Sequence, residues 1–299
     1  MHWPTRLALA ATPIVAVAVL AWRASAETVV DLGTLPPSAR ASSPSEQEAP
    51  PALLRVMTLN LAHGRRLAAN QALLSRTRIA DNLAALGLLV AREAPDIVAL
   101  QEADGPSAWS GRFDHVSALA SFAEYPHLAR GDHAEIGNLP LDYGTALLGR
   151  LPLEAASSHA FQRSWRDTKG WVVATVTIPG LDGIEIDVVS VHLDFLRGWT
   201  RSQQVDRMVE ALAPRERPLV VLGDLNCEHG TEPMSRLVDG LGLHAYEPAD
   251  GDPTFPSTSP RRRLDWILVS EELRVVSHRT LPDAVSDHRA VVAEIALAP

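Results

Sequence analysis

The chain has 299 residues, of which 46% are hydrophobic and 21% charged, so it can bury a large core and is neither a disordered chain nor a coiled coil. Its formal net charge is −9. An acidic protein is a poor general binder of nucleic acid, because such binding depends on basic side chains that neutralise phosphates. Cys227 is the only cysteine, which excludes an intrachain disulfide.

The first 26 residues have the features of a targeting segment. Arg6 precedes an almost wholly apolar run at 7–22, and a small-x-small site at 24–26 stands ahead of Glu27. The run is shorter than the roughly 20 residues that a spanning helix prefers, which favours a cleaved signal peptide. Arg23 lies between the run and the site and leaves an uncleaved anchor open. We therefore expect an exported domain, periplasmic or secreted, or one anchored to a membrane outside the cytoplasm.

Residues 27–52 are rich in Pro, Ser, Ala and Glu and lack an apolar period, so we expect a linker that leads into one folded domain at 53–299. Apolar patterns in the domain predict strands at 54–61, 97–100, 143–148, 171–178, 184–191, 219–222, 264–269 and 291–295, and helices at 77–92 and 205–212. Strands mixed with crossover helices predict an α/β domain of two packed sheets flanked by helices.

Polar side chains of catalytic type follow or interrupt the predicted strands, or precede the last one. They are Asn60; Gln101 and Glu102; His192 and Asp194; Asp224 and Asn226; Asp265; and Ser286, Asp287 and His288. Taken one at a time, each fits a turn, a cap or a structural ion pair better than a catalytic role. Six such positions together indicate one shared site at a rim of the sheets, because Asp and Glu are rarely buried without a partner or a metal.

The ligand types in this set point to a hard cation. Carboxylate and amide oxygens from Glu102, Asp224, Asp287, Asn60 and Asn226 suit Mg²⁺ or Mn²⁺. A closed zinc site is not expected, because the sequence has neither a cysteine pair nor a His-x-x-x-His spacing. A Gly-x-Ser-x-Gly elbow, a Walker-type loop and a dinucleotide-binding glycine loop are also missing from the sequence.

Seven segments carry these residues in order: Met57-Thr-Leu-Asn60-Leu, Asp96-Ile-Val-Ala-Leu-Gln101-Glu102, Tyr143-Gly-Thr-Ala-Leu-Leu-Gly-Arg150, Ser190-Val-His192-Leu, Gly223-Asp224-Leu-Asn226, Arg263-Leu-Asp265-Trp266-Ile and Ser286-Asp287-His288. Together they resemble the endonuclease/exonuclease/phosphatase superfamily, which includes deoxyribonucleases, abasic-site endonucleases, inositol polyphosphate 5-phosphatases and sphingomyelinases. The resemblance covers residues 54–296. It implies a four-layered α/β sandwich that hydrolyses a phosphoester with a metal-assisted water.

The resemblance also implies roles for individual residues. Glu102 is expected to be the principal metal ligand, with Asn60 assisting and Asp287 as a further metal or water ligand. Asp224 is expected to hold or deprotonate the attacking water, with Asn226 beside it.

The remaining expected roles are those of side chains near the phosphate. Asp265 and His288 correspond to a carboxylate–imidazole pair in which the acid orients the ring. His192 corresponds to a second histidine of the deoxyribonuclease, phosphatase and sphingomyelinase branches, and Tyr143 to a tyrosine that contacts phosphate in some branches.

Lys169-Gly170 is similar to a Lys-Gly pair of some sphingomyelinase-like members, although a turn with an exposed lysine is slightly favoured. His63, His229 and His244 are expected to be surface or loop residues.

The substrate class stays open at this stage. A phosphodiesterase or phosphatase on a small or lipid-linked substrate is favoured, with an extracytoplasmic nuclease as the alternative and a non-catalytic binding module as a third reading. The acidic charge disfavours nucleic acid. A calcineurin-like phosphoesterase is disfavoured because its Gly-Asn-His-Asp/Glu segment is missing from the sequence. We expect a monomer.

Overall fold

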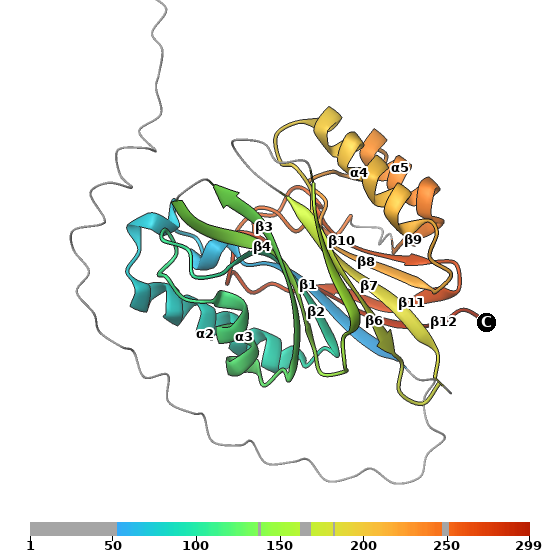
Figure 1. Cartoon of the computed structure of the whole chain (residues 1–299), viewed down its shortest axis with the longest axis horizontal. Coiled ribbons are helices and arrows are strands. Elements are labelled where there is room, and N and C mark those ends of the chain that lie inside the picture. Colours follow the sequence, from blue (N-terminus) through green and yellow to red (C-terminus); the bar gives the residue numbers. More distant parts are fainter. Residues whose placement is uncertain (1–52, 137–138, 162–168, 182, 247–250) are drawn as a thin grey trace, which may run out of the picture. The chain divides into compact units, whose positions relative to one another are not determined.

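Two six-stranded sheets form the centre of the domain (Figure 1). The first has the order β11-β12-β1-β2-β4-β3, with bounds β1 Leu54–Asn60, β2 Ile97–Asp104, β3 His127–Ile136, β4 Leu139–Gly149, β11 Leu273–Thr280 and β12 Val291–Leu297. The second has the order β5-β6-β7-β8-β10-β9, with bounds β5 Glu154–Ala160, β6 Gly170–Thr177, β7 Glu185–His192, β8 Leu219–Asp224, β9 Leu243–Ala245 and β10 Asp265–Ser270. Both sheets mix parallel and antiparallel pairs.

This architecture comes from a computed structural model that describes residues 53–136, 139–161, 169–181, 183–246 and 251–299. The predicted targeting segment at 1–26 and the predicted linker at 27–52 lie outside the described residues. Within the described ranges, none of the helices has both the length and the apolar character that crossing a bilayer requires.

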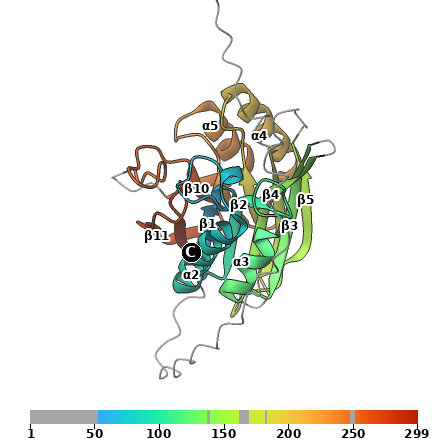
Figure 2. The same ribbon diagram turned by 90° about the vertical axis from the view of Figure 1, so that its left-hand side faces the viewer.

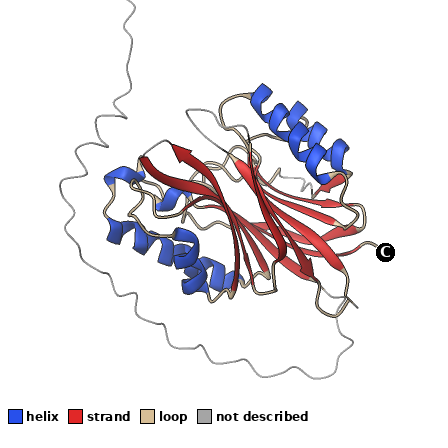
Figure 3. Cartoon of the chain, in the orientation of Figure 1, coloured by secondary structure: helices blue, strands red, loops and turns tan. Residues whose placement is uncertain are grey.

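Three apolar cores hold the layers together. The central core joins the two sheets and includes Val56 and Leu147 from the first and Val188 and Leu222 from the second. Helices α2 (Arg76–Glu93) and α3 (His115–Ala123) pack on the outer face of the first sheet, and α4 (Gly198–Leu212) and α5 (Glu232–Leu241) pack on that of the second (Figures 1 and 3). In Figure 2 the α2 and α3 layer faces the viewer. The predicted four-layered α/β sandwich is confirmed.

The ends of α2 follow from local chemistry. Ser75 caps the helix by accepting a hydrogen bond from the backbone N–H of Arg78 at 3.2 Å, which satisfies an otherwise free donor of the first turn. Ala94 then leaves the helix with a left-handed backbone, and Pro95 cannot continue it. The prediction for 77–92 therefore matches the observed helix within one residue at each end.

The sequence prediction missed several elements and the start of one helix. Helix α4 starts seven residues before the predicted 205, because its first two turns are mostly polar and include the exposed Trp199. Strand β5 was not predicted, since it lies at a sheet edge and most of its side chains are exposed. Helices α3 and α5 and strands β3, β9 and β11 were also not predicted.

Candidate active site

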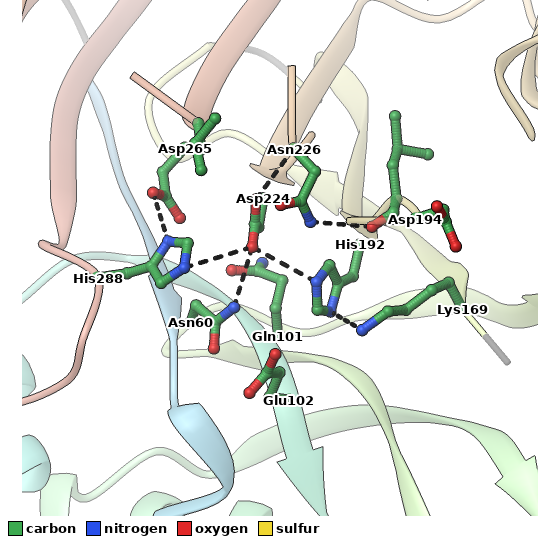
Figure 4. A network of polar contacts seen from close by, with 12 residues as sticks. Asn60, Gln101, Glu102, Lys169, His192, Asp194, Asp224, Asn226, Asp265 and His288 are labelled. Atoms are coloured by element: carbon green, nitrogen blue, oxygen red, sulfur yellow. Dashed lines mark hydrogen bonds and ion pairs between the residues drawn. The ribbon is translucent and has the colours of Figure 1, made fainter. Parts of the chain in front are cut away.

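Polar strand ends from both sheets meet at one edge of the sandwich (Figure 4). In the first sheet, the parallel pairing of β1 with β2 sets Asn60 opposite Gln101. In the second, the parallel pairing of β7 with β8 sets His192 opposite Asp224, and antiparallel β10 begins with Asp265 opposite Asp224 as well. Asn60 Nδ2 donates a hydrogen bond to Asp224 Oδ2 at 3.0 Å, so the two edges form a single site.

Glu102 belongs to this site because β2 is irregular there. The pairing of β2 with β4 shifts register between Leu100 and Ala103, and Glu102 has a φ of 48°, a left-handed conformation that residues with a Cβ rarely adopt. Bulges of this kind re-aim side chains next to active sites. Burial raises the pKa of Glu102, but the nearby charges of His63 and Lys169 outweigh it and lower the pKa to about 2. The carboxylate is therefore ionised.

Asp224 lies at the centre of the network (Figure 4). Its Oδ1 accepts a hydrogen bond from the Asn226 backbone at 3.0 Å. Its Oδ2, already bonded to Asn60, lies 3.4 Å from His192 Nε2 and 3.7 Å from His288 Nε2. Burial raises the pKa of Asp224, but the charge of His288 and the hydrogen bonds from His192 and the Asn226 backbone outweigh it and hold the pKa well below its usual range. This buried carboxylate is therefore ionised.

The predicted pair of Asp265 and His288 is formed. His288 Nδ1 lies 2.8 Å from Asp265 Oδ2, which also accepts a hydrogen bond from Thr254 Oγ1 at 2.6 Å. The Phe255 ring packs against His288, with 4.8 Å between the centroids. Burial lowers the pKa of His288, but the negative charges of Asp265 and Asp224 outweigh it and raise the pKa to about 10. The imidazole is therefore a fixed positive charge beside Asp224.

Lys169 is buried at the site, so the favoured reading of an exposed turn lysine is wrong. Its Nζ lies 3.2 Å from His192 Nδ1. An ammonium group only donates, so His192 Nδ1 accepts and its Nε2 carries the hydrogen that faces Asp224. Lys169 and His192 also line a small hollow with Tyr143 and His133. The hollow thus has a buried cation, Lys169, beside His192 in its lining.

Two predicted residues take other partners. The Asp287 carboxylate forms an ion pair with Arg65, with 2.6 Å between oxygen and nitrogen. The Asn226 side chain turns away from Asp224, and its Nδ2 donates to the Leu193 carbonyl at 3.0 Å. Asp287 therefore lies at the rim, and Asn226 shapes the turn that holds Asp224.

His63 was expected to be a surface or loop residue; it does lie in a short turn, but its side chain is not on the surface. Its side chain is only 12% exposed in the short 3-10 turn η2 (Ala62–Gly64), between Glu102 and Asp104. Burial lowers its pKa, but the charges of these two acids outweigh it and raise the pKa above its usual value. In the sequence, the feature that could have placed His63 near the site is its position three residues after Asn60. Of the other two histidines, His244 is exposed on β9 and His229 is exposed in a loop, as expected.

The chemistry of the donor set fits a divalent cation. Among the described residues, carboxylate oxygens of Asp224 and Asp265 lie within 4.8 Å of each other. Asp265 Oδ1 is buried and accepts no hydrogen bond from the described part of the chain. A buried oxygen without a donor is costly unless a water or a cation satisfies it. With the ionised Glu102 on the first sheet, the site offers oxygen ligands from both sheets.

Comparisons with known proteins identify the family and the fold. The family model described as the endonuclease/exonuclease/phosphatase family matches residues 57–288. A search of curated proteins found no match. Among solved structures, an endonuclease/exonuclease/phosphatase from Beutenbergia cavernae is similar at a TM-score of 0.65 and 20% identity, over 83% of this chain and 72% of that chain.

Two further structures share the fold. The catalytic domain of human Nocturnin, solved with a bound sulfate anion, has a TM-score of 0.63 and 22% identity over 83% of this chain and 96% of its own. A beta toxin structure (275–280) from Staphylococcus aureus has a TM-score of 0.58 and 15% identity over 80% of this chain and 99% of its own. Family members are typically hydrolytic enzymes that depend on divalent metals. The match to the family model spans most of this chain. The chain therefore belongs to the endonuclease/exonuclease/phosphatase family.

Proposed function

We propose that the protein hydrolyses a phosphoester bond by metal-assisted attack of water. The observation that carries the proposal is the position of Asp224, whose ionised, buried carboxylate lies 3.4 Å from His192 and 3.7 Å from His288. The attack of water on a phosphate requires a carboxylate that accepts a proton. It also requires neighbouring groups that supply positive charge or donate hydrogen bonds.

Each residue would contribute one physical step. Asp224 accepts the proton of the attacking water, held in place by its bond from Asn60. His288, kept positive by Asp265, stabilises the charge that develops on the phosphate oxygens. Lys169 would attract a phosphate oxygen at the hollow that it lines with His192. A Mg²⁺ or Mn²⁺ ion held by Glu102 would supply further positive charge to the phosphate.

An apolar rim beside the site supports a lipid-linked substrate. Phe195, Leu196 and Trp199 are 57%, 62% and 59% exposed, within five consecutive residues that follow β7. Lys169 Nζ lies 5.9 Å from the Phe195 ring centroid, so the rim adjoins the phosphate-binding hollow. Arg197 lies over the Trp199 ring and adds a positive charge. Large apolar side chains next to a cation are typical of surfaces that bind lipid head groups and acyl chains.

The loop that carries the rim is held in shape. Asp194 Oδ1 accepts hydrogen bonds from the backbone N–H groups of Leu196 and Arg197, at 2.9 and 2.7 Å. The exposed side chains therefore project from a defined turn. An exported or membrane-anchored location, as residues 1–26 suggest, would bring this rim to a lipid surface.

A substrate panel tests the proposal. The full chain is assayed with Mg²⁺ or Mn²⁺ against phospholipid and sphingomyelin vesicles, soluble inositol phosphates, bis(p-nitrophenyl) phosphate and single- and double-stranded DNA. We expect the highest kcat/KM on a lipid phosphoester and no activity with a chelator. Preferred cleavage of DNA would instead establish the nuclease alternative, and normal metal binding without hydrolysis of any phosphoester would establish a binding module.

A matched pair of variants tests the rim. We expect Phe195→Ser with Trp199→Ser to reduce sedimentation with vesicles and activity on them about tenfold, while activity on bis(p-nitrophenyl) phosphate stays unchanged. The control is Leu88→Ser, since Leu88 is 67% exposed on α2, away from the β7–α4 loop. Equal losses on the vesicle and soluble substrates would contradict a role of the rim in lipid binding.

A further inference from the structure

His63 stands in a line of three polar groups at the carboxyl end of β2. Its Nδ1 lies 2.6 Å from Asp104 Oδ1, and its Nε2 lies 3.2 Å from Glu102 Oε2. Asp104 is fully buried, and its second oxygen accepts a hydrogen bond from Trp109 Nε1 at 2.8 Å. The ring of His63 is thus clamped between two carboxylates of the same strand.

The contact with Asp104 decides which ring nitrogen of His63 carries the hydrogen and which one has the lone pair. A carboxylate accepts, so the hydrogen of a neutral ring lies on Nδ1 and the lone pair lies on Nε2. Without a metal ion, a proton on Nε2 allows the ring to form an ion pair with Glu102 across 3.2 Å. A metal ion bound by Glu102 would take the place of that proton and meet the Nε2 lone pair.

The spacing suits two ligands of one metal ion. In an octahedral site with bonds of roughly 2.1 Å, neighbouring ligand atoms lie about 3 Å apart. Histidines that bind metals almost always donate their other ring N–H to a carboxylate, and Asp104 is in that position for His63.

The surrounding structure fixes the ring rather than leaving it free. Trp109 and Tyr143 pack against it, with ring centroids 5.1 and 5.3 Å away. Asn60 Oδ1 accepts a hydrogen bond from the Ala62 backbone at 2.9 Å, which shapes the turn that carries His63. His63 has a φ of 51°, as unusual for a side-chain-bearing residue as that of Glu102. Strained backbone of this kind persists where function requires it.

We propose that His63 is a nitrogen ligand of the metal ion that Glu102 binds, and that it makes the site prefer Mn²⁺ over Mg²⁺. Mg²⁺ takes oxygen ligands almost exclusively, whereas transition-metal ions accept imidazole. The inference rests on the metal site of the proposed function, but it concerns binding and needs no substrate.

Direct metal binding tests the proposal without any assay of turnover. Free Mn²⁺ is measured by electron paramagnetic resonance during titration of the full chain, and Mg²⁺ is measured by competition. We expect His63→Ala to weaken Mn²⁺ binding at least tenfold and Mg²⁺ binding less than threefold. The control is His244→Ala, an exposed histidine on β9 that is expected to change neither. Mn²⁺ binding by His63→Ala at the wild-type affinity would overturn the proposal.

A measurement on folded wild-type protein covers the case in which His63→Ala is unstable. Pulsed electron paramagnetic resonance of bound Mn²⁺ detects coupling to a directly bound ¹⁴N nucleus. We expect this coupling in the wild type and in separate His192→Asn and His288→Asn variants. Its absence from the wild type overturns the proposal. If ¹⁴N coupling is present but no phosphoester is hydrolysed, the proposed function fails while the assignment of His63 stands.

Discussion

Asp224 and Asp265 face each other across the antiparallel pairing of β8 with β10, and His288 lies between their carboxylates. Two buried acids this close would repel each other if both were ionised without a cation nearby. The imidazolium relieves that repulsion, with its Nδ1 on one acid and its Nε2 toward the other. The register of one strand pair thus explains why a histidine is needed at this position.

Replacing His288 is expected to abolish most turnover. His288→Ala should lower kcat roughly a hundred- to a thousandfold, because the charge that it supplies matters most in the transition state. Asp265→Asn should cause a smaller loss, since the ring remains but is less firmly oriented. Steady-state kinetics on a verified substrate measure both losses, and circular dichroism checks that the variants are folded. A near-normal kcat in His288→Ala would refute the assignment.

The raised pKa of His288 predicts how stability changes with pH. The folded state holds a proton with a pKa of about 10, whereas an unfolded histidine has a pKa of roughly 6.5. The stabilisation from this group is complete below the unfolded pKa and is lost as the pH rises through the folded pKa. Metal-free wild-type protein should therefore show a falling Tm between about pH 6.5 and 10. His288→Gln should show a flatter profile over the same range, and parallel profiles would contradict this account.

Glu102→Gln is expected to weaken metal binding at least tenfold with little change in the fold. The amide keeps the shape of the side chain but removes the charge that attracts the ion. Titration of Mn²⁺ and Mg²⁺, together with a thermal melt without metal, measures the two effects separately. If Glu102→Gln binds the metal ion with the same affinity as the wild type, Glu102 is not a ligand of that ion.

Lys169→Met is expected to lower kcat/KM roughly a hundredfold, because it removes a buried cation next to His192. Lys169→Arg should recover part of the loss, since it restores the charge with a different shape. The kcat/KM values of both variants and of the wild type are measured by Michaelis–Menten kinetics. Equal activity of wild type and Lys169→Met would show that the hollow does not bind phosphate.

The sequence predicted the convergence of polar side chains where strands end in regular structure. Asn60, His192 and Asp224 follow buried apolar runs, and parallel pairing then brings them to one edge. It could not predict contacts that depend on irregular backbone. The bulge of β2 at Glu102 and the turn at His63 have no apolar period, so nothing in the local pattern showed that these side chains meet.

The sequence also did not predict the contact partners of individual side chains. Asp287 and Arg65 are separated by 222 residues, and Thr254 reaches Asp265 from a loop without a recognisable motif. Lys169 resembled an exposed turn residue because its burial depends on the strands that surround it. Their packing brings its Nζ next to His192.

Lys169 is the only lysine among the 299 residues. Protein produced with lysine labelled with ¹⁵N at Nζ therefore carries one labelled side chain, 3.2 Å from His192 Nδ1. Its ammonium group should give one nuclear magnetic resonance signal that needs no assignment. Movement of that signal on addition of phosphate, a metal ion or a candidate substrate would report directly on what enters the hollow, before any catalytic assay exists.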